Sequence, residues 1–169
     1  MSYMFGGCKE LTSININHFN TNNVKDISSI FMDCYKLKEI NLKNFNTSNI
    51  EKMSSSFMNA YSLTSLDLSY FKTSKVKDMS YMFQNCSSLS ALYLHNFDTT
   101  QVTNIMQMFK QCTNMTILDI RNFETSSFIN YNNMFDECYN LTIMINYEKF
   151  KGLYDELPSY VNVINVTFY

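Results

Sequence analysis

The chain has 169 residues, 46% of them apolar, and a formal net charge of −2. Such a composition can build a continuous core, which excludes a disordered segment. Lysine and arginine are scattered, and no apolar run approaches the roughly 18 residues of a membrane span, so neither a nucleic-acid partner nor membrane insertion is expected.

The sequence repeats itself every 26 residues. One column of the repeat is phenylalanine in six successive units, and a second is cysteine in five, with Ala60 in the remaining slot. These columns hold Phe5, Phe31, Phe57, Phe83, Phe109 and Phe135, and Cys8, Cys34, Cys86, Cys112 and Cys138. A fixed period of this length predicts a solenoid in which each coil completes the core of its neighbours.

The first part of each unit has the spacing L-x-x-L-x-L, which predicts a short strand with one buried face. The inward triplets are Leu11/Ile14/Ile16, Leu37/Ile40/Leu42, Leu63/Leu66/Leu68, Leu89/Leu92/Leu94 and Met115/Leu118/Ile120. Five such strands would stack in parallel, one per coil.

The second part of each unit has apolar residues three or four positions apart, as in Val76, Met79, Phe83 and Cys86. This period predicts a short helix with one apolar face. A polar cluster such as Thr73-Ser74-Lys75 precedes it and could cap its first turn. Each coil is thus expected to run strand, turn, helix and return.

The full pattern is M-x-x-M-F-x-x-C-x-x-L-x-x-L-D-L-S-x-F-x-T-S-x-V, nearly complete from Met53 to Val76 and again from Met79 to Val102. It resembles the BspA-like leucine-rich repeats of mycoplasma-type surface lipoproteins and some protist surface proteins. The resemblance implies an α/β solenoid: a leucine-rich-repeat horseshoe with a parallel β-sheet on the concave face and short helices on the convex face. It also implies that the protein is placed at the cell surface or secreted.

One column departs from ordinary leucine-rich repeats. Where these place a ladder of asparagines, this chain has Phe19, Phe45, Phe71, Phe97 and Phe123. An aromatic stack is expected there, and the threonines two residues further on are expected to satisfy the backbone in place of asparagine. These threonines are Thr21, Thr47, Thr73, Thr99 and Thr125.

The repeat register fails after Leu141. Residues 1–141 are therefore assigned to five full repeats preceded by a partial repeat, and residues 142–169 to an atypical C-terminal capping repeat. Within the cap, Tyr147 to Leu157 is expected to be helical, Pro158 to end the helix, and VNVINVTF to form a final strand. No signal peptide precedes the first repeat, and the natural protein is expected to be longer.

The five cysteines invite a disulfide or metal interpretation, because adjacent rungs lie within disulfide range. Each cysteine, however, closes an apolar face, Ala60 fills the same slot, and the chain has no C-x-x-C motif. Buried free thiols are the preferred prediction. No metal and no cofactor are expected.

A stacked sheet would bring Ser69, His95 and Asp119 near one another, and these residue types suggest a hydrolytic Ser/His/Asp arrangement. An open sheet supplies no oxyanion hole and no pocket that excludes water. Solvated polar residues on a strand are the simpler interpretation, so the chain is not expected to be an enzyme.

Candidate binding residues come from the outward strand positions, which vary while the framework stays fixed, and from Tyr70 at an adjoining turn. The later rungs add large side chains that often anchor interfaces. The predicted partner-binding residues are Tyr70, Tyr93, His95, Ile117, Asp119 and Arg121. The alternative is that a strand merely tolerates such residues on its open face.

The function expected from this surface is that of an adhesion-type module, a monomer that binds a protein or glycan partner through the concave strand face. A structural spacer within a longer surface protein is the alternative. A binding module would lose affinity when the strand face is changed, whereas in a spacer only the number of repeats would matter.

Overall fold

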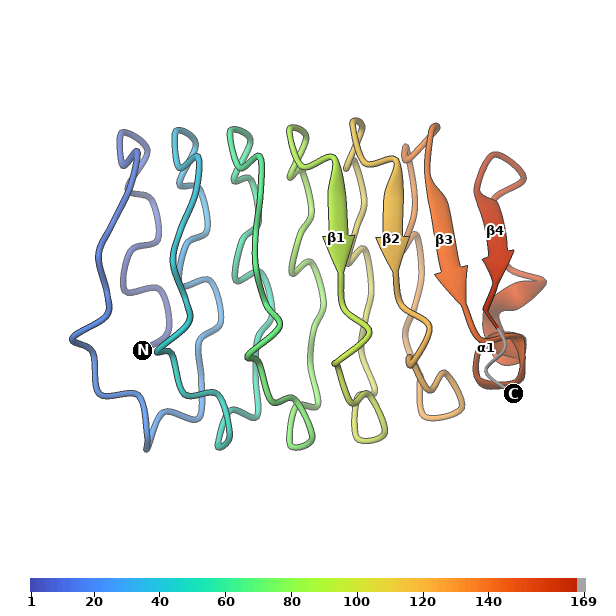
Figure 1. The fold of residues 1–169 in the computed structure, drawn as a ribbon, viewed down its shortest axis with the longest axis horizontal. Coiled ribbons are helices and arrows are strands. Elements are labelled where there is room, and N and C mark those ends of the chain that lie inside the picture. The colour runs from blue at the N-terminus through green and yellow to red at the C-terminus, as the bar shows by residue number, and fades with distance from the viewer. Residues whose placement is uncertain (167–169) are drawn as a thin grey trace.

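The computed structural model describes residues 1–166, which form a single stack of coils (Figure 1). The regular elements are β1 (Ala91–Tyr93), β2 (Ile117–Asp119), β3 (Thr142–Ile145), α1 (Tyr147–Tyr154) and β4 (Asn162–Asn165). The four strands form one parallel sheet in the order β1-β2-β3-β4, with Leu92, Leu118, Ile143 and Val163 in register. The fold is therefore a repeat solenoid built on parallel strands.

The first three predicted strands run beside β1 in the same direction but are not regular strands (Figure 1). Backbone bonds still join them, from the Lys38 amide to the Thr12 carbonyl at 3.3 Å and from the Thr64 amide to the Lys38 carbonyl at 3.1 Å. Their outward residues are Ser, Asn, Glu and Asp, which favour strands less than the Tyr93 and Ile117 of β1 and β2. Horseshoe curvature stays a prediction.

The prediction of short helices on the side opposite the strands is wrong. Within residues 1–146, those segments fold as consecutive turns. We call this side the turn face, made of residues 27–34, 53–60, 79–86 and 105–112. Alternate amides there bond three residues back, as from Met82 to the Met79 carbonyl at 3.3 Å. The amides between them reach the next coil, as from Tyr81 to the Met106 carbonyl at 2.9 Å.

Left-handed residues explain why these turns do not become helices. Two positions in each coil have positive φ, for example Tyr81 at 59° and Asn85 at 61°. A positive φ at the third position of a β-turn defines a type II turn and interrupts helical bonding. Consecutive turns also bring every third or fourth residue to the inside, so their apolar period imitates a helix.

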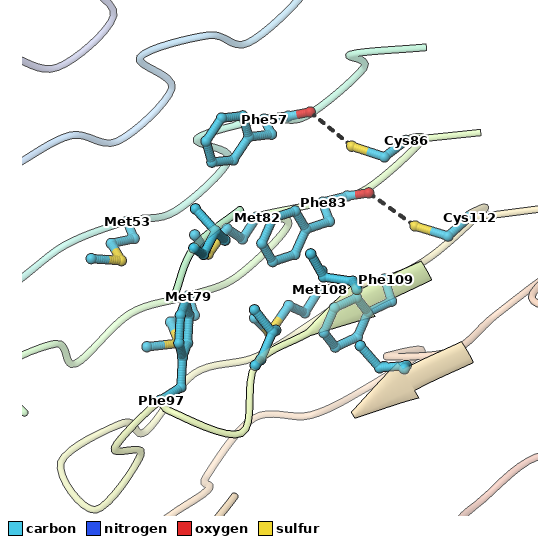
Figure 2. Close-up of a cluster of buried hydrophobic side chains, with 14 of the residues drawn as sticks. Met53, Phe57, Met79, Met82, Phe83, Cys86, Phe97, Met108, Phe109 and Cys112 are labelled. Carbon is cyan, nitrogen blue, oxygen red and sulfur yellow. Dashed lines mark hydrogen bonds between the residues drawn. The ribbon is translucent and has the colours of Figure 1, made fainter. Parts of the chain in front are cut away.

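The core is a continuous column along the solenoid axis. Phenylalanine rings of successive coils stack within it, with Phe83 at 5.8 Å from Phe57 and 5.6 Å from Phe109, measured between ring centroids. Buried methionines such as Met79 and Met82 fill the space beside the stack (Figure 2). Each coil thus buries its large residues against two neighbours.

The threonine column confirms its predicted role. The Thr73 hydroxyl donates to the Asp98 carbonyl at 2.9 Å and accepts from the Asp98 amide at 2.8 Å. Thr47 does the same with Lys72 of the next coil, at 3.0 and 2.7 Å. Three of the five phenylalanines beside them stack as expected, with Phe71 at 6.5 Å from both Phe45 and Phe97. Phe19 departs from the prediction, because it is exposed and its ring lies against Phe5 at 6.0 Å.

The C-terminal segment continues the sheet through β3 and β4 and places α1 between them (Figure 1). The Asn146 side chain caps α1, which buries Phe150 and Leu153. The helix lies inside the range predicted for it, and β4 lies inside VNVINVTF, whose last two residues fall outside the described part of the chain. Its role as a cap stays a prediction. Over residues 1–166, no helix is long and apolar enough to cross a membrane.

Candidate functional site

A hollow of about 890 Å³ lies across the outward side of the first four rungs, over residues 13–95. We call the outward side of residues 13–17, 39–43, 65–69, 91–95 and 117–121 the strand face. The side chains that line the hollow include Ser13, Glu39, Asn41, Lys43, Ser65, Asp67, Ser69, Tyr70, Tyr93 and His95. Aliphatic residues such as Ile14, Ile40 and Leu66 line it as well, so the hollow has a mainly apolar floor with polar groups and two aromatic rings around it.

Charges of both signs line the hollow. Glu39 and Asp67 supply carboxylates, and Lys43 lies over the ring of Tyr70, with its ammonium 5.6 Å from the ring centroid. The amide and the hydroxyl of Ser69 hydrogen-bond to Asp67 and lower the pKa of its carboxyl group. Asp67 is therefore a fixed, ionised acceptor at neutral pH.

The six residues predicted to bind a partner divide into two groups. Tyr70, Tyr93 and His95 line the hollow, and the two tyrosines are 50% and 53% exposed. The second group does not line the hollow and lies one rung further on, at Ile117, Asp119 and Arg121. The structure thus brings three of the six together, and the binding role of all six stays a prediction.

Asp119 is only 2% exposed, and its neighbours occupy its oxygens. Arg121 donates to both carboxylate oxygens, at 2.8 and 2.7 Å, and Nδ1 of His95 lies 3.4 Å from Oδ2. This cluster neutralises a buried charge, as such carboxylates require. The Ser69 hydroxyl bonds to Asp67 of its own coil and not to His95.

Several lining residues could not be singled out from the sequence, because polar and charged side chains are ordinary on an exposed strand position. Glu39, Asn41, Lys43, Ser65 and Asp67 are outward strand positions, but they looked like ordinary solvated residues in the sequence. Their shared position, two residues apart on neighbouring rungs, was the available signal. That they surround a hollow depends on the shape of the stacked coils.

All five cysteines are free. Four are buried as predicted, and Cys8 is exposed, which corrects the expectation for that residue. The buried thiols donate to the phenylalanine carbonyl of the preceding coil, as from Cys86 to Phe57 at 3.2 Å and from Cys112 to Phe83 at 3.1 Å (Figure 2). Their role is structural, because each adds a second hydrogen bond to a core carbonyl that already accepts one from a backbone amide.

Thiol labelling should separate Cys8 from the other four. A thiol reagent such as 5,5′-dithiobis(2-nitrobenzoate) is expected to modify one cysteine in the native protein and five in denaturant, because only Cys8 is exposed. The Cys8→Ser variant should lose the fast reaction entirely. Rapid labelling of two or more thiols in the native protein would contradict the buried column.

Alkaline pH should destabilise the fold through the same column. Burial raises the pKa of Cys86 to about 12 and of Cys34 and Cys138 to about 11, above the ordinary value of 9.0. The folded state therefore keeps protons that the unfolded chain releases, so stability is complete below pH 9 and falls as pH rises toward 11 to 12.

The Cys86→Ala variant isolates one thiol of this effect. Chemical unfolding at pH 8, 9, 10 and 11 should show the parent losing about 1.4 kcal/mol more per pH unit than the variant above pH 9. Ionisation of tyrosine and lysine affects both proteins alike. Equal pH dependence in the two would mean that the Cys86 thiol does not titrate at a raised pKa.

Parallel rungs of L-x-x-L-x-L segments, stacked every 26 residues with a phenylalanine core, define a leucine-rich-repeat solenoid. The chain belongs to the family described as "Mycoplasma protein of unknown function, DUF285", whose model matches residues 1–91 and 64–155. The match confirms the resemblance to mycoplasma-type, BspA-like repeats. No curated protein matches the sequence significantly.

A solved structure shares this fold. It is a leucine-rich repeat protein from Bacteroides ovatus, 18% identical, with a TM-score of 0.52 over 98% of this chain. The chain spans 45% of the length of that protein. Repeat folds of this kind serve protein interaction or scaffolding and are typically not enzymes.

Proposed function

We propose that the protein is a non-enzymatic, adhesion-type binding module that engages a protein or glycan partner through its strand face. The observation that carries this proposal is the hollow of about 890 Å³ across four rungs, with exposed Tyr70 and Tyr93 among its lining residues. Concave sites with a few well-placed polar groups and aromatic rings are where proteins usually hold ligands. Placement at the cell surface, as part of a longer protein, belongs to the same proposal.

Surface plasmon resonance against extracellular-matrix proteins and glycans tests the proposal. The blocking variant is Ser65→Trp, because Ser65 is an exposed residue in the middle of the hollow, where an indole would fill space without disturbing the core. Arg121 is unsuitable for substitution since it neutralises the buried Asp119. The matched control is Ile129→Ala, because Ile129 is 81% exposed and does not line the hollow.

The parent and Ile129→Ala are expected to bind one partner saturably with equal affinity. Ser65→Trp should bind at least tenfold more weakly at an unchanged melting temperature. If the blocking variant binds as well as the parent, the strand face is not the site. If the parent binds nothing in the panel, the structural-spacer role becomes the better account.

A further inference from the structure

Tyr93 interrupts a hydrogen-bonding column that four other coils keep. At the same position these four coils have Asn or Asp, whose side-chain oxygen accepts a hydrogen bond from the backbone amide two residues further on. The bonds join Asn17 to Asn15 at 3.0 Å, Lys43 to Asn41 at 3.0 Å, Ser69 to Asp67 at 2.9 Å and Arg121 to Asp119 at 3.3 Å. Such Asx turns end each strand in a fixed geometry.

Tyrosine cannot make this bond, because its hydroxyl lies at the far end of a rigid ring. The fourth coil therefore gives up a local hydrogen bond that its neighbours on both sides keep. Tyr93 gains no compensating burial, since 53% of it is exposed. Its ring lines the hollow instead.

Tyr70 breaks a second column, immediately before the stacked phenylalanines. His18 and Asn44 hold this position in the earlier coils and Asn96 and Asn122 in the later ones. The side-chain amides of the two later asparagines donate to the preceding coil. The Asn96 Nδ2 atom lies 3.0 Å from the Leu68 carbonyl oxygen, and that of Asn122 bonds to the carbonyl of His95. Tyr70 has no amide to donate, and half of it is exposed beneath the Lys43 ammonium.

Two neighbouring coils thus replace structural side chains by exposed rings that line one hollow. Residues that contradict a local structural rule without a gain in packing are expected at functional sites. We propose that Tyr70 and Tyr93 are stacking platforms for a neutral oligosaccharide bound along the hollow. This inference rests on the proposed function and names its ligand class.

The lining favours a neutral, hydroxyl-rich ligand. Glu39 and Asp67 would repel a polyanion, and Lys43 offsets their charge, so no single sign dominates. A sugar ring presents an apolar C–H face that can pack on tyrosine, whose ring is apolar and whose hydroxyl stays hydrated. Its hydroxyls can pair with the serines, Asn41 and the carboxylates around the two rings. The volume lies within the range of roughly 300–1,000 Å³ typical of small-ligand sites.

The decisive variants restore the residue that the repeat pattern prescribes: Tyr93→Asn and Tyr70→Asn. Calorimetry and saturation-transfer NMR would use chitotetraose, mannotetraose and N-acetyllactosamine as neutral probes, with a heparin hexasaccharide as the anionic comparator. The parent and Ile129→Ala are expected to bind a neutral probe, and each tyrosine variant at least tenfold more weakly. The variants should melt at the parent temperature or about 2 °C above it, because one hydrogen bond is restored.

The outcomes separate this inference from the broader function. A melting temperature several degrees below that of the parent would show that the rings support the fold, which overturns the inference. Binding of only the heparin probe, or of a matrix protein, would overturn the ligand class and leave the strand-face function standing. If the parent binds no glycan and no matrix protein, both fail.

Discussion

Replacing Phe83 by alanine is expected to cost about 4 kcal/mol of unfolding free energy. Phe83 is fully buried, and its ring stacks on Phe57 and Phe109 with interplanar angles of 3° and 7°. The substitution removes the transfer free energy of the ring and both stacking contacts, and leaves a cavity that neighbouring coils cannot close. Urea unfolding followed by circular dichroism measures the loss.

Position along the stack provides the control. Phe5 occupies the same column in the first coil but is only partly buried, and it stacks on a single column neighbour, Phe31, at 5.5 Å. Phe5→Ala should therefore cost about half as much or less. Equal losses at the two positions would show that stacking between coils is not what holds the core together. A loss below about 1 kcal/mol at Phe83 would do the same.

Thr73→Val should be the most costly substitution of a single polar atom, at about 3 kcal/mol, or a fall of about 9 °C in melting temperature. The hydroxyl of Thr73 is buried and satisfies both the amide and the carbonyl of Asp98 in the next coil. Valine keeps the shape but leaves two backbone groups without this partner. Differential scanning calorimetry gives the change directly.

Thr73→Ser separates the hydroxyl from the methyl group. Serine keeps both hydrogen bonds and loses only one methyl, so the expected cost is about 1 kcal/mol. If serine proves as destabilising as valine, packing rather than hydrogen bonding explains the threonine column. Comparing the two variants therefore tests whether the threonine hydroxyls take over the hydrogen bonds that asparagines make in ordinary leucine-rich repeats.

Features that depend on one coil and its neighbour were predictable from sequence. The leucine triplets fixed the inward positions of the rungs, as the full burial of Leu92 and Leu118 shows. The threonine ladder followed from its constant place beside the stacked phenylalanines. Both predictions rest on side-chain alternation and on the fixed spacing between rungs, which every coil shares.

The turn face could not be predicted from the apolar period, because tandem turns and a helix both bury every third or fourth residue. Tandem turns differ from a helix in backbone angles such as the positive φ of Tyr81. A tyrosine in the sequence gives no sign of a positive φ, which non-glycine residues rarely adopt. A glycine occupies an equivalent position only once, at Gly7. These angles are stabilised by the stacking of coils, because alternate amides of each turn face donate to carbonyls of the next coil.

Only part of the candidate site could be predicted from the sequence. Tyr70 and Tyr93 stood out as large outward residues, but the hollow beside them arises from how four rungs pack. Asp119 looked solvated until its bidentate contact with Arg121 placed it among the buried residues. Such contacts depend on side-chain rotamers, which a strand pattern does not determine.

The central claim, that ligands bind on the strand face, is tested most directly by NMR titration of the ¹⁵N-labelled protein with a saturating neutral oligosaccharide. We expect amide shifts to concentrate in residues 39–43, 65–70 and 91–95, which line the hollow. The turn face, including residues 79–86, should stay unchanged. Shifts that gather on the turn face, or that appear equally in the Tyr93→Asn variant, would contradict the account.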